Sequence, residues 1–75
     1  MYRFLVVIEK ADGNYSSYSP DLPGCVATGS TQEEVGQNMY DAIVLPVKGL
    51  IEDDVPVPVS QASSEYLVIG EQVTA

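Results

Sequence analysis

The alternation of apolar and polar positions predicts three β-strands in the N-terminal part of the chain and a fourth near its C-terminus. The first covers residues 2–9, where both alternating faces carry apolar side chains, a pattern typical of a strand in the middle of a sheet. The pair Gly13-Asn14 predicts a hairpin turn to a more polar strand over residues 15–19. A short strand over residues 25–28 follows another turn, and the fourth strand is expected over residues 65–69.

From Thr31 onward the apolar residues recur at spacings of three and four, which is the period of a helix that ends at the acidic run Glu52-Asp53-Asp54. One stripe of this helix is expected to pack on the sheet and comprises Val35, Met39, Ala42, Ile43, Pro46 and Leu50. A second stripe lies beside it and comprises Tyr40, Val44, Val47 and Ile51. Together they form an apolar arc of roughly 200°, about twice what one core-facing side requires. We therefore predict that the second stripe contacts a partner or a second copy of the chain.

Residue chemistry also marks where the helix begins and where it is weakened. Thr31 with Glu34 fits a capping box, in which a hydroxyl and a carboxylate each accept a hydrogen bond from a backbone N–H. Ser30 with Glu33 fits the same pattern one residue earlier, and we prefer Thr31 as the cap. Pro46 removes one backbone hydrogen bond inside the helix, so we expect a kink near residues 43–46.

The segment Leu22-Pro23-Gly24-Cys25 predicts a type II turn between two strands. Pro23 presets the φ angle of the first central position, and Gly24 supplies the positive φ that the second demands. A nucleophilic role for Cys25 needs a base, and the chain contains no histidine, so the usual cysteine and serine triads are excluded. We expect Cys25 to be a packed, inert side chain.

The charge balance excludes several classes of function. Eleven acidic residues against three basic ones give a net charge of -8, which repels phosphate backbones and anionic lipids and favours a basic partner. One cysteine without histidine excludes a disulfide framework and a zinc site, so no cofactor or metal is expected and a reducing cytosol is the simplest location. The apolar run over residues 4–8 is too short to span a membrane. A carboxylate-metal hydrolase that uses Asp21 or Asp41 stays as a minor alternative, but most carboxylates have structural roles.

The run YSPDLPGCVATG over residues 18–29, followed by Ser30-Thr31 and Glu33-Glu34 at the helix start, strongly resembles the HicB antitoxin family of bacterial and archaeal toxin-antitoxin systems. The likeness extends from the first strand through the proline-rich segment after the helix. The resemblance implies a single β-β-β-α-β domain over residues 1–75, of the α+β class, with a partial RNase-H-like fold that lacks that enzyme's activity. Many members also carry a C-terminal DNA-binding module, and residues 70–75 are too few for one, so we expect the short form.

The resemblance further implies a binding function without catalysis. Family members neutralise HicA, a small basic toxin that cleaves messenger RNA, by covering its active surface, and they associate into dimers or larger assemblies. We therefore expect an antitoxin-like protein that binds a HicA-type toxin and self-associates as a dimer or tetramer. The alternative is an orphan domain of the same fold that acts as a homo-oligomeric scaffold or regulatory module without a toxin.

Overall fold

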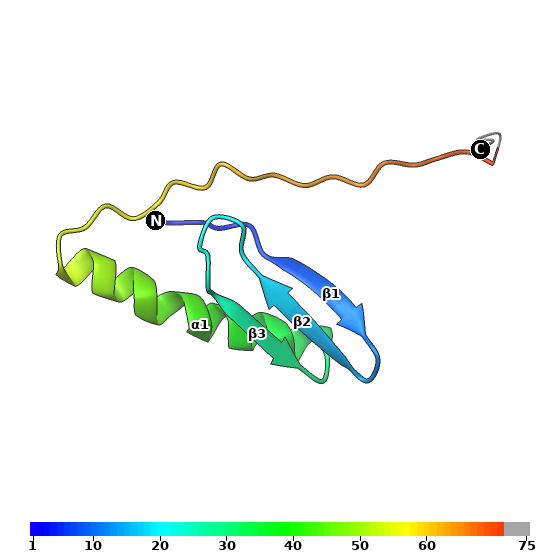
Figure 1. The fold of residues 1–75 in the computed structure, drawn as a ribbon, viewed down its shortest axis with the longest axis horizontal. Coiled ribbons are helices and arrows are strands. Elements are labelled where there is room, and N and C mark those ends of the chain that lie inside the picture. The colour runs from blue at the N-terminus through cyan, green and yellow to red at the C-terminus, as the bar shows by residue number, and fades with distance from the viewer. Residues whose placement is uncertain (72–75) are drawn as a thin grey trace.

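A three-stranded antiparallel sheet with one long helix on it makes up the folded part of the chain. The computed structural model describes residues 1–71 and contains β1 (Val7–Ala11), β2 (Asn14–Tyr18), β3 (Val26–Gly29) and α1 (Gln32–Glu52). The strand order is β1-β2-β3, and α1 lies across one face of the sheet (Figure 1). The α+β class, with a three-stranded antiparallel start followed by one long helix, is therefore confirmed.

The register of the sheet separates a face that packs against α1 from an open face. Ser17 lies opposite Ile8 on one side and Ala27 on the other, and this row belongs to the face under the helix. Tyr18, one residue later, pairs with Val7 and Val26, and this apolar row lies on the opposite face because successive side chains alternate. Tyr18 and Val26 are exposed there, so the second face of the sheet has no covering layer among residues 1–71.

The hydrophobic core lies between α1 and the sheet and is small. Its buried hydrophobic side chains are Leu22, Cys25, Val35 and Met39, and the partly buried residues packed around it are Phe4, Val6, Ala27, Ile43 and Val47. The helix contacts β3 and β2 more extensively than β1. Close approach to β3 depends on Gly29, where a Cβ atom would lie only 2.6 Å from the backbone nitrogen of Val35.

Both ends of α1 are closed by local hydrogen bonds. Thr31 Oγ1 accepts a hydrogen bond of 3.0 Å from the Glu34 N–H, and Glu34 Oε1 accepts one of 3.3 Å from the Ser30 N–H. At the other end, the Val55 N–H donates to the Leu50 carbonyl at 2.9 Å, as in a Schellman motif. Asp54 occupies the left-handed position of this motif at φ 56°, where glycine is the usual residue.

The turn before β3 has the geometry of a type II turn. The Cys25 N–H donates to the Leu22 carbonyl at 3.1 Å, so Pro23 and Gly24 are its two central residues. Gly24 has φ 90°, a conformation that other residues rarely adopt. The turn places the Cys25 side chain in the core.

Cys25 compensates for the proline inside α1. The helix is assigned as one element across Pro46, so the kink expected there does not divide it. Pro46 has no N–H to donate, and the carbonyl that loses its partner is that of Ala42, four residues earlier. The Cys25 Sγ lies 3.8 Å from this Ala42 oxygen and donates a weak hydrogen bond to it.

Two sequence predictions about the strands need correction. The first strand begins at Val7, not at residue 2, because the chain before Val7 has no sheet partner in the described residues. The predicted fourth strand over residues 65–69 does not form within the described chain. Residues 55–71, called the C-terminal tail below, are extended without forming a strand in any sheet of the described chain. A strand is defined by its backbone partners, and the tail leads away from the sheet edge before it reaches these residues (Figure 1).

Candidate interaction surface

An apolar groove runs between α1 and the N-terminal side of the sheet. Its volume is about 500 Å³, and it is lined by Tyr2, Phe4, Val6, Ile8, Gly36, Met39, Tyr40, Ile43, Val44 and Val47. The groove exists because α1 lies mainly over β3 and β2, which leaves the inner side chains of β1 and the preceding residues incompletely covered. Such a concave apolar surface suits a complementary side chain or strand from a binding partner.

The second stripe of the helix lies largely at this groove. Tyr40, Val44 and Val47 line it, and Val47 also packs against the core. Tyr40 is 65% exposed and Val44 is 40% exposed, so both offer apolar area to solvent. Ile51 lies outside the groove, one turn further along α1, and is also exposed.

The opposite wall of the groove was not expected from the sequence. The first strand was expected in the middle of the sheet, whereas the structure places β1 at its edge, with Phe4, Val6 and Ile8 lining the groove. Apolar residues on both sides of a strand indicate that both sheet faces are buried, and they do not indicate a neighbouring strand at each edge. A strand order could not be read from that pattern alone.

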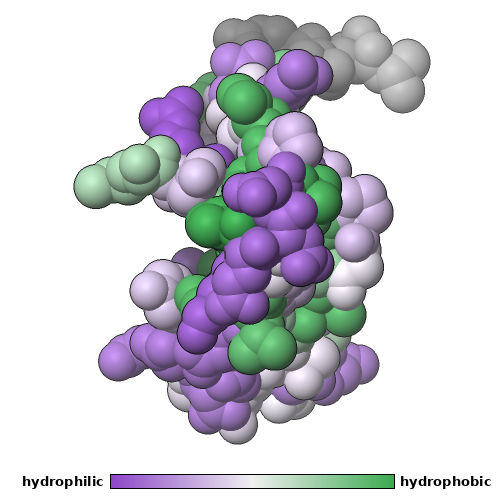
Figure 2. Space-filling model, turned by 90° about the vertical axis from the view of Figure 1, so that its left-hand side faces the viewer, coloured by the Kyte–Doolittle hydropathy of each residue, from purple (hydrophilic) through white to green (hydrophobic). Residues whose placement is uncertain are grey.

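Apolar side chains are also exposed at the end of the molecule where α1 finishes. Figure 2 views the chain from this end and shows hydrophobic side chains lying between polar ones. Exposed apolar residues of α1 and of the tail include Leu45, Ile51, Val55 and Val59. Leu45 and Val59 do not line the groove, so they are exposed apolar positions outside it.

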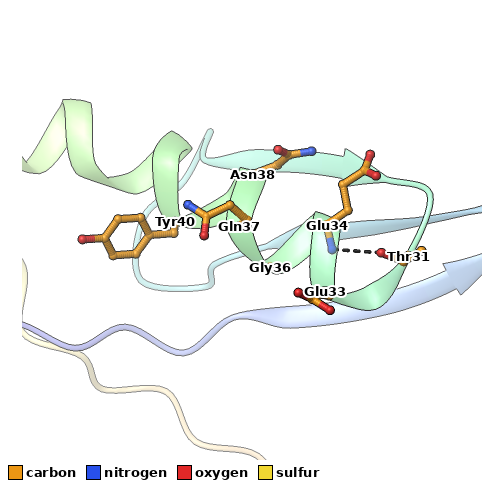
Figure 3. A pocket seen from close by; sticks show the side chains of 7 residues that line it. All are labelled: Thr31, Glu33, Glu34, Gly36, Gln37, Asn38 and Tyr40. Atoms are coloured by element: carbon orange, nitrogen blue, oxygen red, sulfur yellow. Dashed lines mark hydrogen bonds between the residues drawn. The ribbon is translucent and has the colours of Figure 1, made fainter.

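A polar, acidic surface adjoins the groove at the start of α1. Its open hollow of about 550 Å³ is lined by Thr31, Glu33, Glu34, Gly36, Gln37, Asn38 and Tyr40 (Figure 3). Gln37 Nε2 donates to Asp41 Oδ1 at 3.3 Å, and the Asn38 side chain donates to the Thr28 carbonyl at 2.8 Å. Gly36 and Tyr40 line both the hollow and the groove, so acidic and apolar surfaces form one continuous face.

Asp21 fastens the C-terminal tail to the rest of the molecule. Its Oδ2 accepts a hydrogen bond of 2.7 Å from the Ser60 hydroxyl, and its Oδ1 accepts one of 3.0 Å from the Gln61 N–H. These bonds, the Ser60 bond first, hold the pKa of the Asp21 carboxyl below its ordinary value of 3.8, and backbone bonds from Ala62 and Leu5 add to the effect. Asp21, singled out from the sequence only as a minor metal-ligand candidate, is thus a structural acceptor.

Replacing Asp21 with alanine is expected to free the tail without unfolding the sheet. Asp21→Ala removes both acceptors, so the ¹⁵N heteronuclear NOE of Gln61 should fall to the values of a mobile segment. The wild type should behave in the same way once the pH falls through the lowered pKa of Asp21, below 3.8, because the contact is made by the carboxylate and is lost on protonation. Asp12→Ala in the β1–β2 turn is the matched control. An unchanged NOE at Gln61 in Asp21→Ala would contradict this role.

Among residues 1–71, no three histidine, cysteine or acidic side chains lie close enough together to hold a metal ion. Within the same residues, α1 is not apolar enough over a sufficient length to cross a membrane.

Comparison with known proteins identifies the family. Residues 4–71 match the family described as "HicB_like antitoxin of bacterial toxin-antitoxin system". The chain therefore belongs to the HicB-like antitoxins, a class of bacterial toxin-antitoxin proteins. This membership agrees with the sheet, the turn and the helix described above.

A curated relative comes from a bacteriophage. The chain is 36% identical over 62 residues to the "Uncharacterized 14.9 kDa protein in rep-hol intergenic region" of Haemophilus phage HP1 (strain HP1c1). The match covers 83% of this chain and 47% of the relative, so the chain spans about half the length of that protein. No solved structure matches the chain significantly.

Proposed function

We propose that this chain is an antitoxin that binds a small basic, mRNA-cleaving toxin of the HicA type and neutralises it by covering its active surface. The observation that carries the proposal is the family match over residues 4–71. The net charge of -8 supports it, because an acidic protein attracts and orients a basic partner. The chain performs no catalysis of its own in this proposal, and it acts in the cytoplasm.

The continuous acidic and apolar face of α1 is the surface we assign to the toxin. Glu33 and Asp41 are exposed on its acidic part, and Tyr40 lies where that part meets the apolar groove. Charge speeds and orients the encounter, whereas burial of apolar area at about 25 cal/mol per Å² supplies affinity. The two parts of the face therefore have different effects on binding kinetics.

The test mixes the purified chain with a small basic toxin of the HicA type and measures cleavage of an RNA. We expect a stable complex and loss of cleavage at equimolar ratio. Asp41→Lys should slow association, and the difference from wild type should shrink as salt rises. Asp53→Lys at the far end of α1 changes the net charge equally and is the control. A folded chain that neither binds nor inhibits the toxin would refute the antitoxin role. Equal effects of Asp41→Lys and Asp53→Lys would refute only the assignment of the toxin surface to the start of α1.

A homo-oligomeric scaffold without a toxin is the second candidate, and the exposed second stripe favours it. We propose that in this second case Tyr40, Val44, Val47 and Ile51 contribute to a contact between copies. Val44→Asp puts a charge at the groove and should lower the mass measured by light scattering. Leu45→Asp, on the 76% exposed neighbouring residue, is the control. If Val44→Asp leaves the mass unchanged, the stripe has another role.

A further inference from the structure

The C-terminal tail ends in an apolar segment that the described structure leaves uncovered. Tyr66 is 101% exposed and Val68 is 95% exposed, and their neighbours Leu67 and Ile69 are also exposed. In an extended chain Tyr66 and Val68 lie on one side and Leu67 and Ile69 on the other. Four consecutive apolar residues, with both sides hydrophobic, are typical of a strand that is buried on both faces.

The tail lies beside residues 1–5, the part of the chain that leads into β1. Residues 57–60 of the tail and residues 1–3 line one shared hollow, and residues 60–64 of the tail line the next one with residues 3–5. The tail therefore runs parallel to the chain that leads into β1, and the bonds from Ser60 and Gln61 to Asp21 fix it there. Beyond these residues the tail diverges from β1 and projects away from the molecule (Figure 1).

The edge of β1 is the surface that fits this segment. In the order β1-β2-β3, one edge of β1 has no backbone partner among residues 1–71. The same edge borders the apolar groove, whose wall is formed by Phe4, Val6 and Ile8. A strand added here pairs with the unpaired backbone groups of β1, and one row of its side chains packs on the wall of the groove that Phe4, Val6 and Ile8 form.

We propose that residues 66–69 of one copy add as a strand to the free edge of β1 in a second copy, and that the exchange is reciprocal. The path of the tail favours a second copy over the same chain. The Asp21 contact holds residues 60–61, and beyond them the tail leads away from its own β1, so residues 66–69 lie where another molecule can reach them (Figure 1). Exchange of identical elements is a common route to a dimer.

The proline-containing segment before the Asp21 contact also favours a tail that leads away from its own sheet. Pro56 and Pro58 restrict the backbone to extended conformations, so the tail is a semi-rigid arm. The small core, with only four buried hydrophobic side chains in the described residues, also gains from a second copy. The proposal does not depend on the identity of a toxin, and its test uses the chain alone.

The first experiment measures mass by size-exclusion chromatography with light scattering. The wild type should have twice the chain mass of 8.1 kDa. Val68→Asp should shift it to the monomer at the same concentration, because the charge would have to enter an apolar interface. Val59→Asp is the matched control on the same arm, where the side chain is 79% exposed, and should leave the dimer intact. A monomeric wild type, or a dimer that is indifferent to Val68→Asp, would overturn the proposal.

The second experiment decides between exchange and closure within one chain. A chain with Glu9→Cys on β1 is mixed with a differently tagged chain with Val68→Cys, and a disulfide between the two tags is expected on a non-reducing gel. Thr28→Cys on β3, at the opposite edge of the sheet, replaces Glu9→Cys in the control and should not be linked. Cys25 is kept because its side chain is buried. A disulfide that forms only when both cysteines are in the same chain, at monomer mass, would show closure and refute exchange. Absence of any link to Glu9→Cys would also refute it.

Discussion

Gly29→Ala is expected to lower the free energy of unfolding by about 1–3 kcal/mol, the usual cost of forcing extra atoms into a packed site. The added methyl would lie 2.6 Å from the Val35 nitrogen and 2.9 Å from its Cα, and both are backbone atoms of α1 that cannot rotate away. The helix must therefore shift off β3, which also disturbs the groove on its other side. Thermal unfolding followed by circular dichroism measures the effect.

Gly36→Ala is the matched control for this substitution. Its Cβ meets nothing within 4 Å, and alanine is the better helix former by about 1 kcal/mol, so this variant should be as stable as the wild type or more stable. Equal midpoints for the two variants would mean that α1 does not approach β3 as closely as described.

Met39→Ala is expected to cost about 2–5 kcal/mol, as other deletions of large buried side chains do. Met39 is 1% exposed and packs with Leu22 and Cys25, so its removal leaves a cavity in a core that has few other members. A domain of this size has a total stability on the order of 5 kcal/mol, so the variant should lose a large part of it and unfold at a much lower urea concentration than the wild type. Urea denaturation at several temperatures provides the measurement.

Leu45→Ala on the same helix tests whether burial is the cause. Leu45 is 76% exposed, and its truncation should change the free energy of unfolding by less than about 0.5 kcal/mol. If the two substitutions cost the same, the core would not be centred on Met39.

The helix, the turns and the approximate positions of the strands could be predicted from the sequence because each depends on residues that are close together in the chain. The helix over Gln32–Glu52, the two turns and the three strands follow from periodicity and from glycine, proline and hydroxyl positions. Strand boundaries differ by one to five residues at the N-terminal end of each strand, since a strand begins only where a neighbour supplies hydrogen bonds. The early start predicted for the first strand is the clearest example.

Long-range relations were not predictable in the same way. The sequence marks residues 65–69 as strand-forming, but it does not say which chain supplies the partner, and the described chain supplies none. Asp21 and Ser60 are 39 positions apart, and nothing in either residue indicates that they meet. One wall of the groove, the second stripe of α1, could be predicted from the sequence. The other wall could not, because it depends on the position of β1 in the strand order.

The family match and the exposed apolar face together indicate a protein that acts by binding a partner. Its acidic helix start and its groove form one continuous face, so charge and apolar burial act on the same partner surface. A toxin at that face and a second copy at the β1 edge can be distinguished by the variants above. The two contacts meet at Tyr40, the rim residue common to the acidic hollow and the groove.

The bond between Cys25 and the Ala42 carbonyl makes the chain's single thiol a natural reporter of motion. A maleimide can reach this sulfur only when α1 lifts from β3, since the side chain is 8% exposed in the closed arrangement. The labelling rate, divided by that of a free thiol, then gives the opening equilibrium without any engineered probe. A ligand that holds α1 against β3 would slow the labelling of Cys25, and a tighter ligand would slow it more.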